Sequence, residues 1–337
     1  MKILRYLLFP FAFLYGLGVR LRHFLYDHHL LKSKSYPLPI ICVGNLTVGG
    51  TGKTPMIEYL VRLIGEEHVA ILSRGYKRKA RGFSLANNLS SALSLGDEPY
   101  QFHRKFPQSK IAVCESRATG IETLLAHYTP KVILLDDAMQ HRGVQAGLTL
   151  LLTSYPTLYT KDFLLPVGNL RDVTQRSKAA QVIIVTKCPS LSKEEQQKIL
   201  KELNPFPYQK VFFTGIHYSE MVYTNNDNRI PLTNFIQTPF TLVTGIANPL
   251  PLVHFLKGEN ASFEHLQYND HHHFSAKEIQ FLQEKRKILT TEKDFVRLSE
   301  YLPEIFYLPI ETYFLSETAQ EDFNTIIKSY ISNNKRS

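Results

Sequence analysis

The sequence predicts an α/β protein built on a doubly wound, mostly parallel β-sheet, with a second, smaller α/β domain. The first observation is length, because 337 residues exceed one typical hydrophobic core and suit two domains. The second is the alternation of short, wholly apolar segments with stretches whose apolar residues recur at helical spacing. Strands that are apolar throughout and separated by helices indicate a parallel sheet covered on both faces. Such sheets bind ligands outside the carboxyl ends of their strands.

Seven apolar segments in the first two thirds of the chain are predicted to be strands. They are residues 40–43, 69–72, 111–114, 132–135, 148–152, 182–186 and 211–214. Residues 54–67 and 117–128 lie between them and have the apolar spacing of helices. A shorter series follows, with strands at 240–243, 287–290 and 306–308 and helices near 251–257 and 276–284. The predicted domains are 31–217 and 234–337, with residues 218–233 as a linker or hairpin.

The first thirty residues, 1–30, are predicted to form a hydrophobic helix at a membrane interface. Residues 6–19 are an unbroken run of apolar and small residues with basic residues on both sides. A helix needs about 20 apolar residues to span a bilayer, so this run is too short to cross. No small-residue cleavage site of a signal peptide follows it. The pattern favours a helix that lies in the interface, and an ordinary helix packed on the domain is the alternative.

Charge and cysteine content narrow the classes of partner. The 39 Lys and Arg residues against 30 Asp and Glu residues give a formal net charge of +9. Basic proteins usually bind nucleic acid, anionic lipid or phosphorylated substrates. The sequence has no basic tract with interleaved aromatic residues and no zinc-finger spacing, which favours lipid and phosphate. Cys42, Cys114 and Cys188 each adjoin an apolar segment, which indicates buried, reduced thiols and a cytosolic compartment.

The strongest chemical signal is the glycine-rich segment between the first predicted strand and the helix that follows it. Residues 44–54 read Gly-Asn-Leu-Thr-Val-Gly-Gly-Thr-Gly-Lys-Thr, which is a P-loop except that Thr47 replaces a Gly. The N–H groups of such a loop wrap the β-phosphate of a nucleotide, and the helix N-terminus adds a favourable dipole. Lys53 is expected to reach the β- and γ-phosphates, and the Thr54 hydroxyl to ligate Mg²⁺. The predicted nucleotide-binding residues are Thr47, Val48, Gly49, Gly50, Thr51, Gly52, Lys53 and Thr54.

A second signal is an apolar strand that ends in two carboxylates, Asp136 and Asp137, about eighty residues after the P-loop. In P-loop proteins a carboxylate at such a strand end holds the magnesium shell. One of the two is therefore expected to face the metal and the other a water molecule or a side chain. The sequence leaves open which of them does which.

The residues that follow another strand bear on the choice of nucleotide. Guanine-binding proteins of this class carry Asn/Thr-Lys-x-Asp at a strand end. Here the corresponding residues, 186–189, read Thr-Lys-Cys-Pro and lack the carboxylate. The sequence therefore predicts ATP.

The acceptor side is less determined by the residues themselves. Arg74 opens a basic loop at a strand end, where phosphate or headgroup contact and simple solvation are alternatives. Asp97 suits a helix cap, although a kinase that acts on a hydroxyl also needs a carboxylate near the acceptor. The consecutive His271, His272 and His273 cannot all converge on one metal ion and have no cysteine nearby. A single His that orients a carboxylate across the domain cleft is the better interpretation.

Taken in order, these motifs resemble the tetraacyldisaccharide 4′-kinases, the lipid A 4′-kinases of Gram-negative bacteria. The resemblance rests on residues 44–55, 73–76, 96–99, 136–141, 164–168, 270–271 and 291–294. It implies a kinase that transfers the γ-phosphoryl group of ATP, with Mg²⁺, to the 4′-hydroxyl of a tetraacyldisaccharide 1-phosphate in lipid A biosynthesis. It also implies a peripheral or monotopic enzyme on an anionic membrane surface, at the cytoplasmic face of the inner membrane. No nucleic acid and no obligate protein partner are expected.

The resemblance also implies roles for single residues. Asp97 is expected to be the catalytic base and His271 its partner, acting with Lys53, while Asp136 and Asp137 lie on the metal side. The residues expected around the acceptor are Arg74, Tyr76, Glu98, Arg117, Gln140 and His141. Asn169 and Asp172 depart from the family pattern, which more often has other residues and a Glu, so the role of Asp172 stays open.

Two other functions stay open from the sequence. A membrane-recruited nucleotide switch would use the same phosphate loop but would not need Asp97 or His271. A cytosolic small-molecule kinase would use the N-terminal helix for packing alone.

Overall fold

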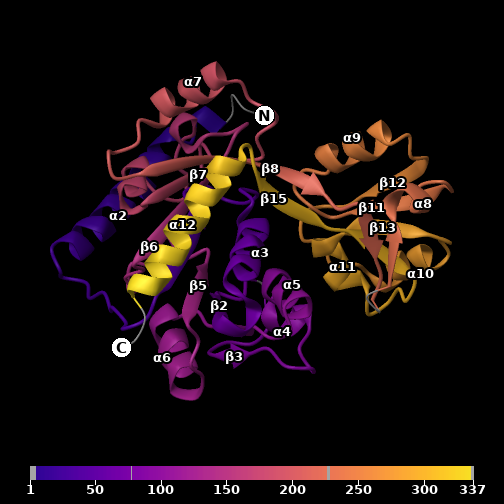
Figure 1. Ribbon diagram of the computed structural model, residues 1–337, viewed down its shortest axis with the longest axis horizontal. Coiled ribbons are helices and arrows are strands. Elements are labelled where there is room, and N and C mark those ends of the chain that lie inside the picture. The colour runs from indigo at the N-terminus through magenta and orange to yellow at the C-terminus, as the bar shows by residue number, and fades with distance from the viewer. Residues whose placement is uncertain (1–4, 77, 226–227, 335–337) are drawn as a thin grey trace.

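The protein has two lobes, each built around its own β-sheet. The computed structural model describes residues 5–76, 78–225 and 228–334. A nine-stranded sheet forms the large lobe and a six-stranded sheet forms the small lobe (Figure 1). The prediction of a doubly wound, mostly parallel sheet with a smaller second α/β unit is confirmed.

The large sheet has the order β15-β8-β7-β6-β1-β5-β2-β4-β3. From β8 to β4 the strands run parallel, and they correspond to the predicted apolar segments of the first domain. The two edge strands, β15 and β3, are antiparallel to their neighbours. The bounds are β1 Ile40–Asn45, β2 Val69–Ser73, β3 Ser84–Leu85, β4 Lys110–Val113, β5 Val132–Asp136, β6 Leu148–Ser154, β7 Val182–Thr186, β8 Lys210–Tyr218 and β15 Ile310–Phe314.

Helices cover both faces of the large sheet, which is why its central strands are buried throughout. Successive residues of a strand point to opposite faces, so Ile41 and Val43 of β1 enter one core while Ile40 and Cys42 enter the other. The first core is closed by α3 Lys53–Ile64, α5 Asp97–Lys105 and α12 Glu317–Asn333. The second is closed by α6 Arg117–His127 and α7 Lys193–Leu203. Shorter segments are α4 Ala92–Leu95 and the 3₁₀ turns Glu66–His68, Tyr159–Lys161 and Thr174–Ala179.

The small sheet has the order β10-β9-β14-β13-β11-β12 and is also covered on both faces. Its strands are β9 Met221–Tyr223, β10 Arg229–Pro231, β11 Phe240–Thr244, β12 Phe263–Gln267, β13 Ile288–Thr291 and β14 Ile305–Leu308. Its helices are α8 Leu232–Phe235, α9 Leu250–Gly258, α10 Ala276–Gln283 and α11 Glu292–Leu298. The pair α8 and α9 packs on one face, and α10 and α11 pack on the other.

The end of the chain returns to the large lobe, where the structure differs from the predicted domain range 234–337. Strand β15 pairs with β8, and α12 buries Phe323 and Ile327 in the core beside α3. Residues 218–233 also differ from a simple linker, because the hairpin β9–β10 belongs to the small sheet; residues 226–227 of this range fall outside the described residues. Apolar spacing predicts that a segment is buried, but it does not say on which sheet.

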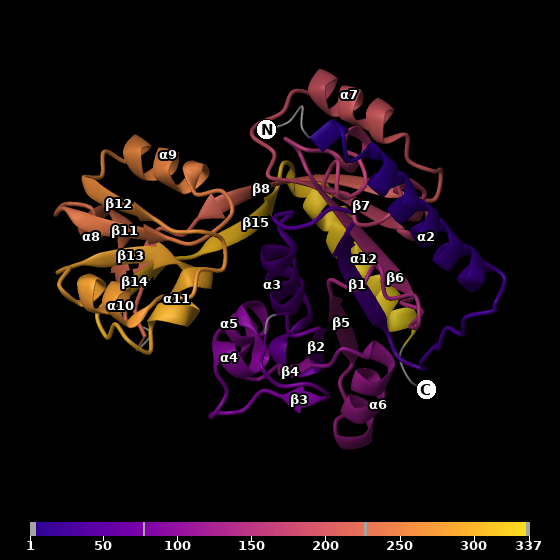
Figure 2. The same cartoon turned by 180° about the vertical axis from the view of Figure 1, so that it is seen from behind.

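The N-terminal helix α2, Phe9–Asp27, lies along the outside of the large lobe (Figure 2). Residues 1–4 of the predicted helix fall outside the described residues. Many of its large apolar side chains are exposed, among them Phe11, Phe13, Leu14, Leu17, Leu21 and Phe24. In the described part of the chain, no helix has both the length and the apolar character needed to cross a membrane.

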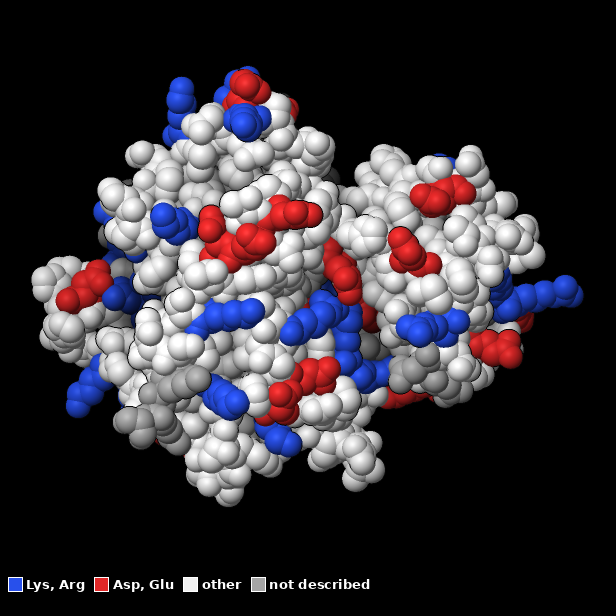
Figure 3. Space-filling view, viewed as in Figure 1, with Lys and Arg blue, Asp and Glu red and all other residues white. Residues whose placement is uncertain are grey.

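A buried charged bridge joins the two lobes. The Lys105 ammonium on α5 lies 2.6 Å from Glu58 Oε2 on α3 and 2.7 Å from Glu292 Oε1 on α11. Burial and the nearby charge of Glu58 raise the pKa of Glu292 to about 7. Burial disfavours the Lys105 ammonium, but the two carboxylates outweigh that effect and raise its pKa. Figure 3 shows Lys and Arg side chains gathered beside acidic ones along the junction of the lobes.

Replacing Lys105 with Met is expected to lower the free energy of unfolding by about 3 kcal/mol or more, because two buried carboxylates lose their shared partner. Denaturant unfolding measures this change. Lys161→Met is a matched control, since Lys161 forms an exposed pair with Glu202 at 2.7 Å, and exposed pairs contribute about 1 kcal/mol or less. Equal losses in the two variants would contradict a role for the bridge in stability.

Candidate active site

The glycine-rich segment forms a tight turn between β1 and α3. Its glycines adopt left-handed backbone conformations that other residues disfavour, with φ of +73° at Gly49, +40° at Gly50 and +82° at Gly52. The Asn45 amide donates to the Thr51 hydroxyl at 2.8 Å, and this hydrogen bond ties the loop to the end of β1. The loop therefore ends at the N-terminus of a long helix, where backbone N–H groups bind phosphate.

Asp136 lies at the carboxyl end of β5, directly beside β1. It pairs in register with Val43, and its Oδ2 accepts a hydrogen bond of 2.5 Å from Ser73. Its other oxygen, Oδ1, is buried and has no hydrogen-bond partner among the described residues. Burial, together with the charges of Glu98 and Asp137, raises the pKa of Asp136 to about 7. A buried oxygen without a donor fits a hard cation, which prefers carboxylate ligands.

Asp137 differs from its neighbour because it faces two cations. One Arg171 nitrogen donates to its Oδ2 at 2.8 Å and another contacts its Oδ1. The Lys53 ammonium lies 3.6 Å from Oδ1. Burial opposes the ionisation of Asp137, but the bond from Arg171 and the charge of Lys53 outweigh it and hold its pKa at about 2. The lysine of the P-loop is thus directed toward an ionised carboxylate.

Arg171 is a residue of this site to which the sequence analysis gave no role. Besides Asp137 it contacts the Asn45 side-chain oxygen at 2.5 Å. Its backbone N–H donates to the carbonyl of Leu46 at 2.9 Å, so main chain and side chain both hold the phosphate loop. The only signal in the sequence was that Arg171 follows the segment 164–168 that carried the family resemblance.

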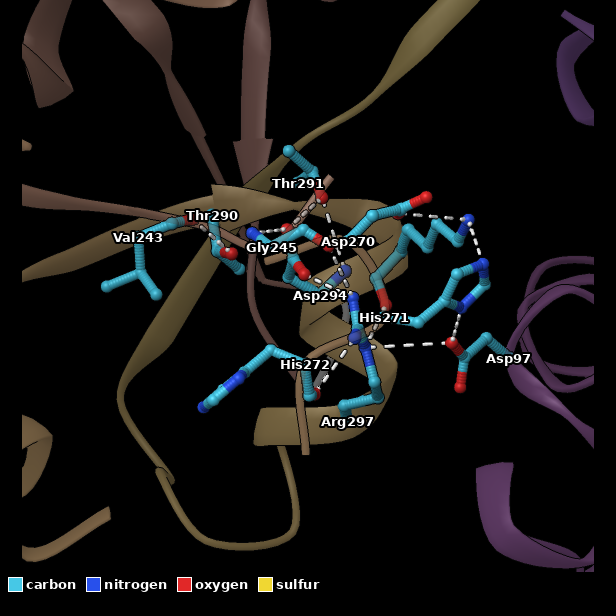
Figure 4. A network of polar contacts seen from close by, with 11 residues as sticks. Asp97, Val243, Gly245, Asp270, His271, His272, Thr290, Thr291, Asp294 and Arg297 are labelled. Carbon is cyan, nitrogen blue, oxygen red and sulfur yellow. Dashed lines mark hydrogen bonds and ion pairs between the residues drawn. The ribbon is translucent and has the colours of Figure 1, made fainter. Parts of the chain in front are cut away.

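Asp97 and His271 meet across the junction of the lobes (Figure 4). Asp97 is the first residue of α5, and the distance from its Oδ2 to His271 Nδ1 is 2.9 Å. The Lys293 ammonium lies 3.0 Å from His271 Nε2 and can only donate, so Nε2 accepts and the ring proton is on Nδ1. Nδ1–H therefore donates to Asp97. Burial would raise the pKa of Asp97, but His271 and Arg297 outweigh it and lower it.

A second carboxylate of the small lobe, Asp294, holds the backbone that positions His271. Asp294 accepts from the Gly245 N–H at 2.9 Å and from the Thr291 hydroxyl at 2.7 Å, and it pairs with Arg297. The Arg297 guanidinium also lies 3.7 Å from Asp97 Oδ2. The His271 N–H donates to the Gly245 carbonyl at 3.1 Å. Arg297 was not among the residues predicted from the sequence, although its position three residues after Asp294 on a helix was a signal for the pair.

The remaining sequence-predicted residues separate into two groups. Arg74 and Tyr76 are exposed, and the Tyr76 ring centroid lies 6.0 Å from that of His271. Glu98 lies in the first turn of α5, and its charge acts on Asp136. His272 points away from its neighbour and bonds Glu278 at 3.0 Å, so the histidines do not share one target.

The other group supports the strand ends. The Gln140 amide donates to the Asn45 carbonyl at 2.8 Å, behind the phosphate loop. Arg117 is buried and donates to the carbonyls of Cys114 at 2.7 Å and Asp136 at 3.1 Å. Burial and then the charge of Arg117 lower the pKa of His141 to about 4, so this ring is neutral at pH 7.

A pocket between the lobes is lined by Tyr76, Gly96, Asp97, His271 and Arg297, among other residues. A phosphate loop with a carboxylate at the adjoining strand end, together with a carboxylate–histidine pair in a cleft, defines a P-loop phosphotransferase. The model of the family described as Tetraacyldisaccharide-1-P 4'-kinase matches residues 4–331. The chain belongs to this family of ATP-dependent kinases of lipid A biosynthesis.

Similar proteins agree with this membership. The chain is 48% identical to a tetraacyldisaccharide 4'-kinase of Flavobacterium johnsoniae over 99% of both chains. It is 44% identical to one of Bacteroides thetaiotaomicron, with 98% of this chain and 94% of the other covered. The crystal structure of LpxK from Aquifex aeolicus in complex with ATP has a TM-score of 0.80 and 29% identity, with 97% of this chain and 99% of that chain covered.

Proposed function

We propose that Asp97 is the base in this kinase and takes the proton of the acceptor's 4′-hydroxyl, while His271 orients it. The observation that carries the proposal is the 2.9 Å hydrogen bond between them, formed by residues of different lobes in the wall of the pocket. The acceptor is a tetraacyldisaccharide 1-phosphate. As the hydroxyl proton moves to Asp97, the acceptor oxygen bonds to the γ-phosphorus, the bond to the bridging oxygen breaks, and ADP leaves.

The electrostatic environment suits Asp97 to this role. Its lowered pKa keeps the carboxylate ionised at neutral pH, and the Nδ1–H of His271 fixes the direction of one oxygen. Lys293 holds the far side of the ring at 3.0 Å, so the ring does not change its tautomer while it orients the base. The small-lobe residues His271, Arg297 and Lys293 therefore favour the charged form of Asp97.

The phosphate side is proposed to stabilise the transferring group. Lys53 and the N–H groups of residues 47–54 would carry the β- and γ-phosphates. The Thr54 hydroxyl and the unpartnered oxygen of Asp136 would hold Mg²⁺, with Asp137 beside them, and the bound ion would neutralise phosphate charge. The described residues contain no cluster of three His, Cys, Asp or Glu side chains for a metal, which fits an ion held partly by ATP itself.

The residues proposed to contact the acceptor are those exposed beside the base. Tyr76 lines the pocket, and Arg74 is exposed two residues before it, so the two suit the sugar and the phosphate of the acceptor. Glu98 follows the proposed base on α5, and its charge acts on Asp136. The proposed role of Arg117, Gln140 and His141 is to hold the backbone beneath the acceptor. Their contacts lie at the strand ends and the phosphate loop.

Membrane attachment is proposed for α2. Its exposed apolar side chains suit the headgroup boundary of a bilayer, which is where a lipid acceptor resides. Because ATP is supplied from the cytoplasm, the proposed location is the cytoplasmic face of the membrane, with the enzyme as a peripheral or monotopic protein. A small-molecule kinase has no use for this exposed surface. A nucleotide switch has no use for the Asp97–His271 pair.

The phosphate-loop assignment predicts that Lys53→Ala lowers kcat on the order of 10²-fold or more, because the lost cation acts mainly on charge that develops during transfer. The measurement is ADP production with a tetraacyldisaccharide 1-phosphate acceptor in detergent. Lys34→Ala serves as the control, since its ion pair with Glu122 is exposed and it lies before the amino end of β1, away from the phosphate loop. A near-normal kcat in Lys53→Ala would remove the loop from the mechanism.

The base assignment predicts coupled losses. Asp97→Ala and His271→Ala are each expected to reduce kcat strongly, and the double variant to be little worse than the poorer single variant, because the two side chains act as one unit. The affinity for ATP, measured separately by calorimetry, should change little. Fully multiplicative losses in kcat would show that the two residues work independently.

The membrane assignment predicts that Phe13→Ser combined with Leu17→Ser weakens co-sedimentation with anionic liposomes several-fold, because both side chains are exposed apolar surface on α2. Leu89→Ser, another exposed apolar side chain but on the large lobe away from this helix, is the control. If both proteins sediment like the unmodified chain, the exposed face of α2 is not the membrane contact.

A further inference from the structure

The loop of residues 162–173, called here the bridging loop, contacts the phosphate loop through residues 169–171. The Val48 N–H donates to the Asn169 carbonyl at 2.8 Å, and the Arg171 N–H donates to the Leu46 carbonyl at 2.9 Å. The Arg171 side chain then reaches Asp137 at 2.8 Å. The bridging loop is thus the layer that supports the phosphate loop from one side.

The opposite side of the bridging loop is bonded to α2. The Tyr15 hydroxyl donates to the Arg171 carbonyl at 2.7 Å. His23 Nε2 lies 2.6 Å from Asp172 Oδ1, and Asp172 is only 1% exposed. Near the start of α2, the Phe9 ring packs edge-on against Phe163 with centroids 5.5 Å apart. The helix therefore contacts the loop at its beginning and at its end.

The contact between His23 and Asp172 is a directed hydrogen bond. Arg142 Nη1 donates to His23 Nδ1 at 3.2 Å and to the His23 carbonyl at 3.1 Å. A guanidinium only donates, so Nδ1 is the acceptor and the ring proton is on Nε2, where it is donated to Asp172. A buried carboxylate needs such donors, and the Val173 N–H also donates to this oxygen at 2.8 Å.

Arg171 is the residue at which these contacts meet. Its N–H is held by the phosphate loop, its carbonyl by Tyr15, and its side chain holds Asp137 and Asn45. We propose that α2 is a structural part of the ATP site, in which His23 and Tyr15 are positioning residues that hold the bridging loop so that Arg171 orients Asp137 and the phosphate loop. This second role of α2 goes beyond membrane attachment and depends on neither the liposome contact nor the base assignment.

The test is the affinity of the full-length protein for MgATP in detergent without lipid acceptor, measured by calorimetry with a non-hydrolysable ATP analogue. His23→Ala is expected to weaken binding by about tenfold, as loss of an outer-layer hydrogen bond typically does. His23→Gln keeps an amide N–H near the place of Nε2–H and should recover most of the affinity. Tyr15→Phe, which removes one hydroxyl, should weaken binding by about threefold.

Two controls separate positioning from simple destabilisation. His28→Ala removes the ring of the residue just after this helix, whose centroid lies 4.1 Å from that of Phe24, and it should leave the affinity for MgATP unchanged. In an Arg171→Ala background, His23→Ala should have no further effect, because the helix acts through Arg171. The proposal is overturned if His23→Ala binds MgATP like the unmodified chain, if His23→Gln loses as much as His23→Ala, or if the Arg171 and His23 losses multiply. Liposome co-sedimentation should be unchanged in all of these variants.

Discussion

The meeting of Asp97 with His271 depends on how the two lobes are held together, and the buried Lys105 bridge lies at that contact. Helix α3 opens with Lys53 and α5 opens with Asp97, while α11 carries the lysine that bonds His271. Lys105 joins all three helices through two buried carboxylates. Misplacing reacting groups by about 1 Å costs on the order of 10²-fold in rate. The bridge joins the end of α5 to the middle of α3 and the start of α11, and it restricts how far the small lobe can shift because its carboxylates are buried.

The same site shows how environment divides chemically identical residues. Asp136 and Asp137 are neighbours, yet burial raises the pKa of one to about 7 and cations hold that of the other at about 2. Backbone geometry makes the difference possible, since Asp137 has a left-handed φ of +51° that turns its side chain toward Lys53 and Arg171. Asp97 differs from both, because His271 and Arg297 compensate for its burial and keep its carboxylate ionised. On the proposed roles, the three carboxylates therefore serve a metal ion, a lysine and a proton without exchanging roles.

The sequence predicted what depends on local pattern and missed what depends on tertiary partners. The seven parallel strands and the phosphate loop carry their own signatures, in apolar runs and in glycines placed before a lysine. Arg171 and Arg297 carry only weak signals, the neighbouring family segment and the helical spacing to Asp294, because an arginine acquires its role from the carboxylate that the fold brings to it. The return of β15 and α12 to the large lobe was missed for the same reason. Family resemblance, not spacing, singled out Asp97 and His271 as a pair, since 174 residues separate them.

The N-terminal helix exposes an apolar surface and is also hydrogen-bonded to the large lobe. The apolar run 6–19 accounts for the exposed surface, whereas the attachment to the protein comes from Tyr15 within it and from His23 beyond it. A helix bound only by apolar contacts would slide or rotate at little cost, because dispersion contacts are not directional. Hydrogen bonds to a backbone carbonyl and to a buried carboxylate fix both its rotation and its position. On the proposed membrane role, this fixes the height of the catalytic pocket above the bilayer, so that an acceptor held by its acyl chains meets the base without leaving the lipid.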